Sequence, residues 1–246
     1  MIIRMQVICE NKPKCLFSLA SIALLIVVIV LAVSGGGSTA KWKTPREPDA
    51  TRRTYALLAG IPQRGSVLGY REAPVTLQFF GDLQCLGSRQ VMLGALPFLI
   101  RRWVRTGKLQ IRYRSTESDT AGAGGWPEFR EQQLAALAAG RQNKLWHFID
   151  VFYREQGPEF TGYADRAFLH EIGVLAGLEL EGWDSEREFP EDFVTQLETD
   201  ETLARKEGLE STPSFLIGPT GGTARPLRHF GLQEPQVFEE AIRGLL

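Results

Sequence analysis

One cysteine stands between a predicted buried strand and a predicted helix. The run 74–80 is apolar and rich in β-branched and aromatic residues, which predicts the strand. Gly81 and Asp82 end this run, Cys85 follows, and a helical pattern of apolar residues begins at Val91. The unpaired N–H groups and the dipole at a helix start favour negative charge, and thiolate is the nucleophilic form of cysteine. We therefore predict that Cys85 is a nucleophile.

A neighbouring arginine bears on the reactivity of this thiol. Arg89 lies one turn further along the predicted helix, and its positive charge is predicted to tune the acidity of Cys85. The alternative is that Cys85 is a small buried hydrophobe, which is a common fate of free cysteine. Its position against a glycine-containing turn, rather than inside an apolar run, favours the catalytic interpretation.

The same segment resembles the active-site region of the DsbA-like branch of the thioredoxin superfamily. In that family a strand ends in an acidic-aromatic turn and leads into Cys-x-x-Cys at a helix N-terminus. The resemblance extends through Pro97, which matches a proline that kinks the family's active-site helix, to the next strand at 109–114. One departure is central: the second cysteine of the motif is Ser88 here, so the motif is a degenerate Cys-x-x-Ser.

Ser88 decides the mechanism that the resemblance implies. In a dithiol site the second thiol resolves the mixed disulfide, whereas an alkoxide neither forms S–S bonds nor leaves like a thiolate. Cys85 can still attack a disulfide and hold its partner. We therefore predict a membrane-anchored oxidoreductase working by monothiol exchange on extracytoplasmic proteins that contain cysteine, or on small thiols, with an external thiol for release. The alternative is a redox-inactive thioredoxin-like module that binds peptides or proteins.

A second motif, Thr212–Pro213, opens a predicted strand late in the chain. Sequence alone predicts a trans bond, because only about 5–6% of X–Pro bonds in folded proteins are cis. The resemblance reverses that expectation, since in thioredoxin-like proteins a cis proline before this strand faces the active-site cysteine. The preceding residue offers backbone groups to an extended peptide there. Thr212 and Pro213 are therefore predicted to bind substrate.

Composition narrows the classes of function. The formal net charge of −1 gives no reason to expect a nucleic-acid partner. The other two cysteines, Cys9 and Cys15, lie before or at the edge of a hydrophobic run, so the folded part holds one thiol and closes no internal disulfide. The three histidines show no metal-ligand spacing. We expect no metal and no cofactor. The Cys-x-x-Ser motif also resembles, more weakly, that of the monothiol glutaredoxins, which bind glutathione and an iron–sulfur cluster, but the residues next to the motif differ.

The N-terminal region contains an uncharged apolar run that begins at Leu16 and ends at Val33. Its 18 residues reach the lower limit for crossing a bilayer. A signal peptide cleaved near Ser34 is the alternative, but the run exceeds a usual signal core, which favours an uncleaved single-pass anchor. Lys and Arg residues are more numerous just after the run than before it, so charge does not place the main domain outside the cell membrane. That extracytoplasmic placement follows from the resemblance.

The rest of the chain is divided by composition and periodicity. Residues 1–34 form the tail and anchor, and residues 35–65, rich in Gly, Ser, Lys, Pro and Arg, are predicted to be a flexible tether with at most a short helix at 54–59. Residues 66–246 are predicted to be an α/β thioredoxin fold with a helical domain inserted at about 120–208. Helical spacing in the insertion predicts one long helix through 134–152 and others near 164–176 and 190–206.

Overall fold

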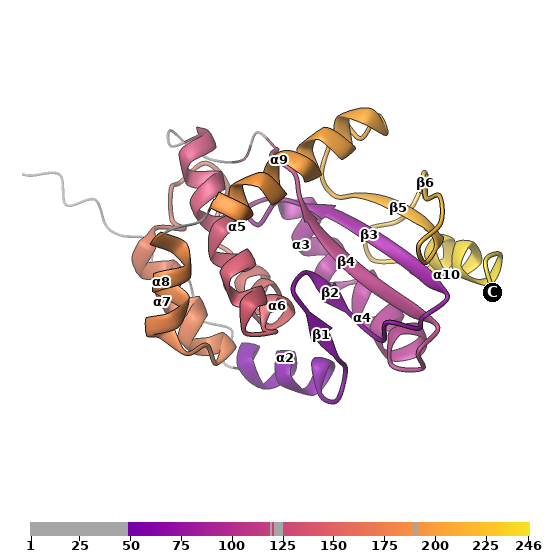
Figure 1. Ribbon diagram of the computed structural model, residues 1–246, viewed down its shortest axis with the longest axis horizontal. Coiled ribbons are helices and arrows are strands. Elements are labelled where there is room, and N and C mark those ends of the chain that lie inside the picture. Colours follow the sequence, from indigo (N-terminus) through magenta and orange to yellow (C-terminus); the bar gives the residue numbers. More distant parts are fainter. Residues whose placement is uncertain (1–48, 119, 121–124, 189–190) are drawn as a thin grey trace, which may run out of the picture. The chain divides into compact units, whose positions relative to one another are not determined.

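A mixed β-sheet forms the centre of the computed structural model, which describes residues 49–118, 120, 125–188 and 191–246 (Figure 1). In this described part the sheet has six strands in the order β1-β2-β4-β3-β5-β6. The central strand β3 pairs in parallel with β4 and antiparallel with β5. The strands are β1 (Gln63–Arg64), β2 (Val67–Leu68), β3 (Val75–Gly81), β4 (Leu109–Ser115), β5 (Ser214–Pro219) and β6 (Arg225–Pro226).

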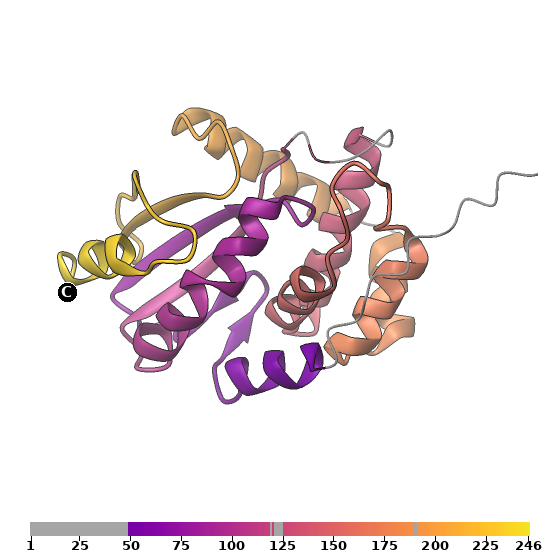
Figure 2. The ribbon, with the colours of Figure 1, turned by 180° about the vertical axis from the view of Figure 1, so that it is seen from behind.

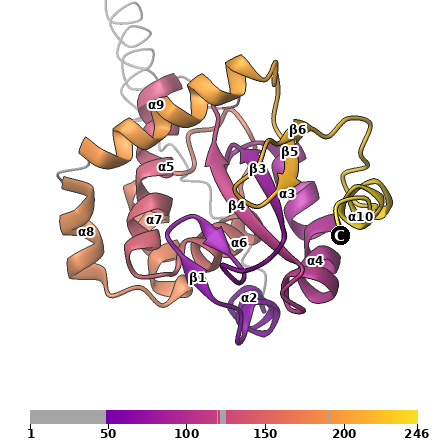
Figure 3. The same ribbon diagram turned by 45° about the vertical axis from the view of Figure 1, so that its right-hand side comes forward.

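The two faces of the sheet are covered by different helices. One face is covered by α3 (Leu86–Leu93), α4 (Ala95–Leu99) and α10 (Gln236–Arg243), as Figure 2 shows. Phe79 and Phe215 stack on this side at 5.2 Å, and Phe238 of α10 meets Phe215 edge-on at 4.9 Å. The other face meets α9 (Glu191–Lys206), where Phe80 and Ala204 belong to a second, smaller apolar cluster (Figure 3).

The segment that follows Cys85 is helical, but it is interrupted. The break lies at Gly94, between α3 and α4, three residues before Pro97, which the resemblance predicts to kink this helix. Proline removes one helical hydrogen bond and crowds the carbonyl four residues before it, so the distortion falls in the preceding turn. The segment that contains Gln233 also passes close to Gly94, since a Cβ added to Gly94 would lie 2.9 Å from the Cα of Gln233. A π-helical turn (Ile100–Val104) then leads toward β4.

Five helices lie between β4 and β5 in the described residues. They are α5 (Gly125–Arg141), α6 (Leu145–Glu155), α7 (Arg166–Ala176), α8 (Leu180–Glu188) and α9. The single long helix predicted through 134–152 is wrong, because the chain turns at Asn143, whose φ of 56° is left-handed and ends α5. The aromatic side chains of α6 belong to the core, since Trp146 and Phe148 are fully buried.

The tether prediction for residues 35–65 is wrong for its described part. Residues 50–58 form α2 (Ala50–Leu58), which packs against α6. Thr54 is fully buried and donates its hydroxyl to the Asp150 carboxylate, and Arg105 donates to the carbonyl oxygens of Leu57 and Ala59 at 2.9 and 2.8 Å. These polar contacts to distant residues hold the segment, and composition does not show them.

No helix in the described ranges is long and apolar enough to cross a bilayer. The apolar run from Leu16 to Val33 lies outside the described residues, as do residues 35–48 of the predicted tether.

Stability at acidic pH is expected to depend on His147, which packs against Tyr55 and lies beside Gln63. The Gln63 amide lies 2.9 Å from its Nδ1, and burial, with the charge of Lys144, lowers the pKa of His147 to about 4. Below pH 6.5 His147 binds a proton in the unfolded chain, whereas in the native state it stays unprotonated until the pH falls to about 4. Wild type should therefore lose about 1–2 kcal/mol relative to His147→Gln between pH 6.5 and 4, measured by urea unfolding. A difference in unfolding free energy between wild type and His147→Gln that does not change with pH would contradict this prediction.

Candidate active site

The register of the central strands brings the two predicted motifs together. Phe80 of β3 pairs with Ser214 of β5 in an antiparallel arrangement, so the end of β3 and the start of β5 share one edge of the sheet. Cys85 follows β3 and is the N-cap of α3, while Pro213 directly precedes β5. The Cys85 thiol donates to the Thr212 carbonyl oxygen at 3.4 Å, and Thr212–Pro213 is cis, as the resemblance implies.

The contact between α3 and the proline segment depends on a glycine. A Cβ added to Gly87 would lie 3.0 Å from Pro213 Cδ and 3.6 Å from Cys85 Sγ. A larger residue would therefore push the helix away from the proline. Cys85 itself is 8% exposed and lies nearly buried beside Thr212 and Pro213.

The other two predicted site residues are placed differently. Ser88 is fully buried, and its hydroxyl accepts a hydrogen bond from the Asp82 N–H at 3.4 Å. Arg89 donates from Nε to the Tyr153 carbonyl oxygen at 2.8 Å, which ties α3 to α6. A structural role for Arg89 is therefore visible, and its effect on the acidity of Cys85 stays a prediction.

Asp82, to which sequence reasoning gave no role, anchors the turn that carries Cys85. It is 2% exposed, and its Oδ1 accepts from the Gln84 N–H at 2.9 Å. Its Oδ2 accepts from the Ser118 N–H and hydroxyl at 3.1 and 2.7 Å and from the Thr120 hydroxyl at 2.8 Å. Burial raises the pKa of Asp82 above its ordinary value of 3.8. This carboxyl therefore fastens the active-site turn to the segment that leaves β4.

The raised pKa of Asp82 gives this residue a defined effect on stability. The native state holds the Asp82 proton to a higher pH than the unfolded chain does. The stability that protonation contributes is fully present below pH 3.8 and is lost as the pH rises through the raised pKa. In urea unfolding across this range, the stability of wild type relative to Asp82→Asn should fall as the pH rises above 3.8. A rise in relative stability with pH would refute this assignment.

The loop after α6 also reaches the active-site turn. Gln156 donates to the carbonyl oxygens of Leu83 at 2.8 Å and Cys85 at 3.4 Å. Glu159 accepts from the Leu86 N–H at 2.7 Å through its Oε1. These partners lie 71 to 73 residues beyond the turn, and nothing in their local sequence pattern marks them as part of the site.

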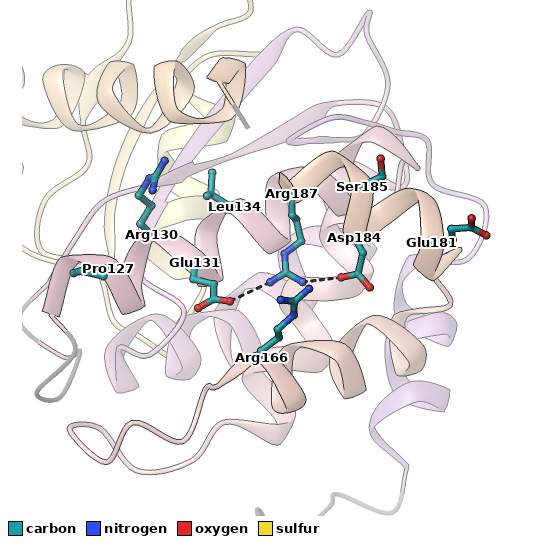
Figure 4. A pocket seen from close by; sticks show the side chains of 9 residues that line it. All are labelled: Pro127, Arg130, Glu131, Leu134, Arg166, Glu181, Asp184, Ser185 and Arg187. Carbon is teal, nitrogen blue, oxygen red and sulfur yellow. Dashed lines mark hydrogen bonds and ion pairs between the residues drawn. The ribbon is translucent and has the colours of Figure 1, made fainter. Parts of the chain in front are cut away.

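A separate cavity of about 770 Å³ lies in the helical insertion, between α5, α7 and α8 (Figure 4). Arg187 occupies its centre and pairs with Glu131 and Asp184. No cysteine or histidine lines it, and its three arginines are matched by three acidic residues. Its lining residues are Pro127, Arg130, Glu131, Leu134, Arg166, Glu181, Asp184, Ser185 and Arg187. We therefore place the candidate chemistry at Cys85 and not in this cavity. Within the described residues no group of His, Cys, Asp and Glu is suited to hold a metal.

A strand, a helix opened by a single cysteine and a facing cis proline define a thioredoxin-like protein with a DsbA-like helical insertion. The thioredoxin family model matches residues 63–223, well over half of the chain, and the protein belongs to this family.

Solved structures share this architecture. BdbD from Bacillus subtilis, in its oxidised form, aligns with a TM-score of 0.60 at 19% identity, over 75% of this chain and 96% of BdbD. A thioredoxin-like oxidoreductase from Silicibacter pomeroyi aligns with a TM-score of 0.55 at 23% identity, over 78% and 96%. The thiol-disulfide exchange protein α-DsbA2 from Wolbachia pipientis aligns with a TM-score of 0.56 at 15% identity, over 80% and 97%. No curated protein matches the chain in sequence.

Proposed function

We propose that this protein is a thiol–disulfide oxidoreductase that works by monothiol exchange through Cys85. The observation that carries the proposal is the position of the Cys85 sulfur, at the N-terminus of α3 and 3.4 Å from the carbonyl oxygen of Thr212 beside the cis bond. Similar folds include an oxidoreductase and a thiol-disulfide exchange protein, which supports the same class of reaction.

The exchange begins with attack by the Cys85 thiolate on one sulfur of a partner's disulfide. A new S–S bond joins Cys85 to the partner as the old S–S bond breaks, and the released thiolate takes a proton from water. Ser88 is buried and carries no thiol, so it cannot displace the partner. Release then requires a second thiol from outside, carried either by the partner itself or by a small molecule.

The surroundings of Cys85 suit an extended polypeptide segment. Thr212 and Pro213 are the residues proposed to bind the substrate backbone, because they lie at the start of β5 and against the thiol. Two large apolar side chains are exposed in neighbouring segments: Leu86 at 47%, directly after Cys85, and Phe160 at 60%, directly after Glu159, which bonds to the Leu86 N–H. Such side chains favour partners that present apolar residues near a cysteine.

The cellular setting belongs to the same proposal. The apolar run from Leu16 to Val33 would hold the protein in the cell membrane as a single-pass anchor, with the thioredoxin-like domain on the extracytoplasmic side. Cysteine-containing proteins of that compartment, or small thiols, would then be the partners.

Alkylation in intact cells tests reactivity and sidedness together. In the full chain carrying Cys9→Ser and Cys15→Ser, we expect a membrane-impermeant maleimide to label Cys85 within minutes, and Cys85→Ala to abolish the labelling. Labelling only after lysis would contradict the extracytoplasmic placement. Absence of labelling in the folded, purified protein would contradict the exchange reaction, and retention of the cellular role by Cys85→Ala would favour the binding module.

A further inference from the structure

A carboxylate accepts a hydrogen bond from the backbone N–H of the residue that follows the active-site cysteine. The Leu86 N–H, the first after the N-cap, donates to Glu159 Oε1 at 2.7 Å. Bonds of this length between an N–H and an ionised carboxylate are charge-assisted and strong. The N–H of the residue that directly follows Cys85 is therefore bound to a negatively charged side chain of the insertion.

The loop that carries Glu159 is fixed on both sides of it. Gln156 bonds to the carbonyl oxygens of Leu83 and Cys85. The Phe160 N–H donates to the Thr120 carbonyl oxygen at 3.1 Å. These bonds hold Glu159 at the N–H of the residue that follows Cys85.

Asp82, Glu128 and Glu159 place three carboxyl groups at the active-site turn. Asp82 is buried and enclosed by donors, but Glu159 and Glu128 are both partly exposed. Glu128, at the start of α5, accepts from the Gln84 side chain at 3.2 Å. Arg89, the nearby cation on α3, is turned to the Tyr153 carbonyl oxygen. The approach to Cys85 is therefore lined by negative charge on the insertion side.

We infer that Glu159 is a specificity-determining residue, which selects against anionic thiols and for partner cysteines that lie beside Lys or Arg. The inference rests on the proposed exchange reaction at Cys85 and names the class of thiol that completes it. Glu128 contributes to the same charge through its bond to Gln84, which directly precedes Cys85.

The charge acts on the step that releases the partner. An incoming thiolate attacks the partner's sulfur in the mixed disulfide, a new S–S bond forms between them, and Cys85 leaves as a thiolate that is protonated by water. The two sulfurs exchange places, and no net oxidation or reduction occurs. A carboxylate elsewhere on the incoming thiol is repelled by Glu159, whereas an ammonium or guanidinium group is attracted.

Two alkylating reagents of similar size isolate this effect. In the full chain with Cys9→Ser and Cys15→Ser, the rate of Cys85 alkylation is measured with anionic iodoacetate and with neutral iodoacetamide at one pH. The fraction of thiolate is common to both reagents and cancels in the ratio of their rates. We expect Glu159→Gln to raise the iodoacetate-to-iodoacetamide ratio about threefold to tenfold at low salt, and about 1 M salt to remove most of this difference.

Matched variants separate charge from structure. Glu159→Asp keeps the charge and should keep the wild-type ratio. Glu179→Gln removes a carboxylate that bonds backbone N–H groups at the start of α8, a helix that carries no cysteine, and should also leave the ratio unchanged. With a mixed disulfide formed at Cys85, Glu159→Gln should also speed release by 3-mercaptopropionate and slow release by cysteamine, each relative to 2-mercaptoethanol.

The outcomes distinguish the inference from the proposed function. If Cys85 in the folded protein fails to react even with iodoacetamide, the exchange reaction is contradicted. If Cys85 reacts but Glu159→Gln leaves the ratio unchanged, or changes both rates equally, the role of Glu159 in specificity is overturned. Should Glu159→Gln fail to fold, the salt dependence of the wild-type ratio serves as the test, and a ratio that does not rise with salt overturns the inference.

Discussion

A Ser88→Cys variant is expected to release a partner from Cys85 at least about a hundredfold faster than wild type without added thiol, because a second thiol at position 88 attacks within the same molecule. Positions 85 and 88 lie one helical turn apart at the start of α3, which is the spacing at which side chains become neighbours. The measurement is the lifetime of a mixed disulfide between Cys85 and a cysteine peptide, followed by intact mass.

Ser88→Ala provides the control for this variant. It removes the buried hydroxyl and the bond from the Asp82 N–H but adds no thiol, so its mixed disulfide should last as long as that of wild type. An unchanged lifetime in Ser88→Cys would show that position 88 does not reach the mixed disulfide. Equal acceleration in both variants would show that the hydroxyl, and not the missing thiol, controls release.

Asp82→Ala is expected to destabilise the fold by about 3 kcal/mol, because it leaves the buried donors of Gln84, Ser118 and Thr120 without their acceptor. The free energy of unfolding in urea measures the loss. The same bonds position the turn that carries Cys85. The rate of Cys85 alkylation in Asp82→Ala should therefore also differ from the rate in wild type. A loss below about 1 kcal/mol would contradict the anchoring role of this carboxyl.

Local patterns in the sequence located much of the fold and the centre of the site. The apolar run before Gly81 marked β3, and the break before Cys85 marked the start of α3, because both features are set by residues adjacent in the chain. The cis bond before Pro213 came from the family resemblance, since the residues alone predict trans.

Other features depend on contacts that no local pattern contains. The turn at Asn143 interrupts a run with continuous apolar spacing, and α2 is held by Asp150 and Arg105 from distant segments. Some of the side chains at the active-site turn come from the insertion, as Glu159 does, and their positions follow from how the helices pack. Periodicity predicts which face of an element is buried, but it does not identify the element that it meets.

In the proposed reaction Cys85 captures a disulfide partner and, because Ser88 stands in place of a second thiol, holds it. The most direct measurement is intact mass after the full chain with Cys9→Ser and Cys15→Ser is mixed with an excess of a disulfide-linked peptide, and the free peptide is then removed. We expect one peptide adduct on Cys85, which persists for hours and is released by dithiothreitol. No adduct on the folded protein, or an adduct that disappears without added thiol, would contradict it.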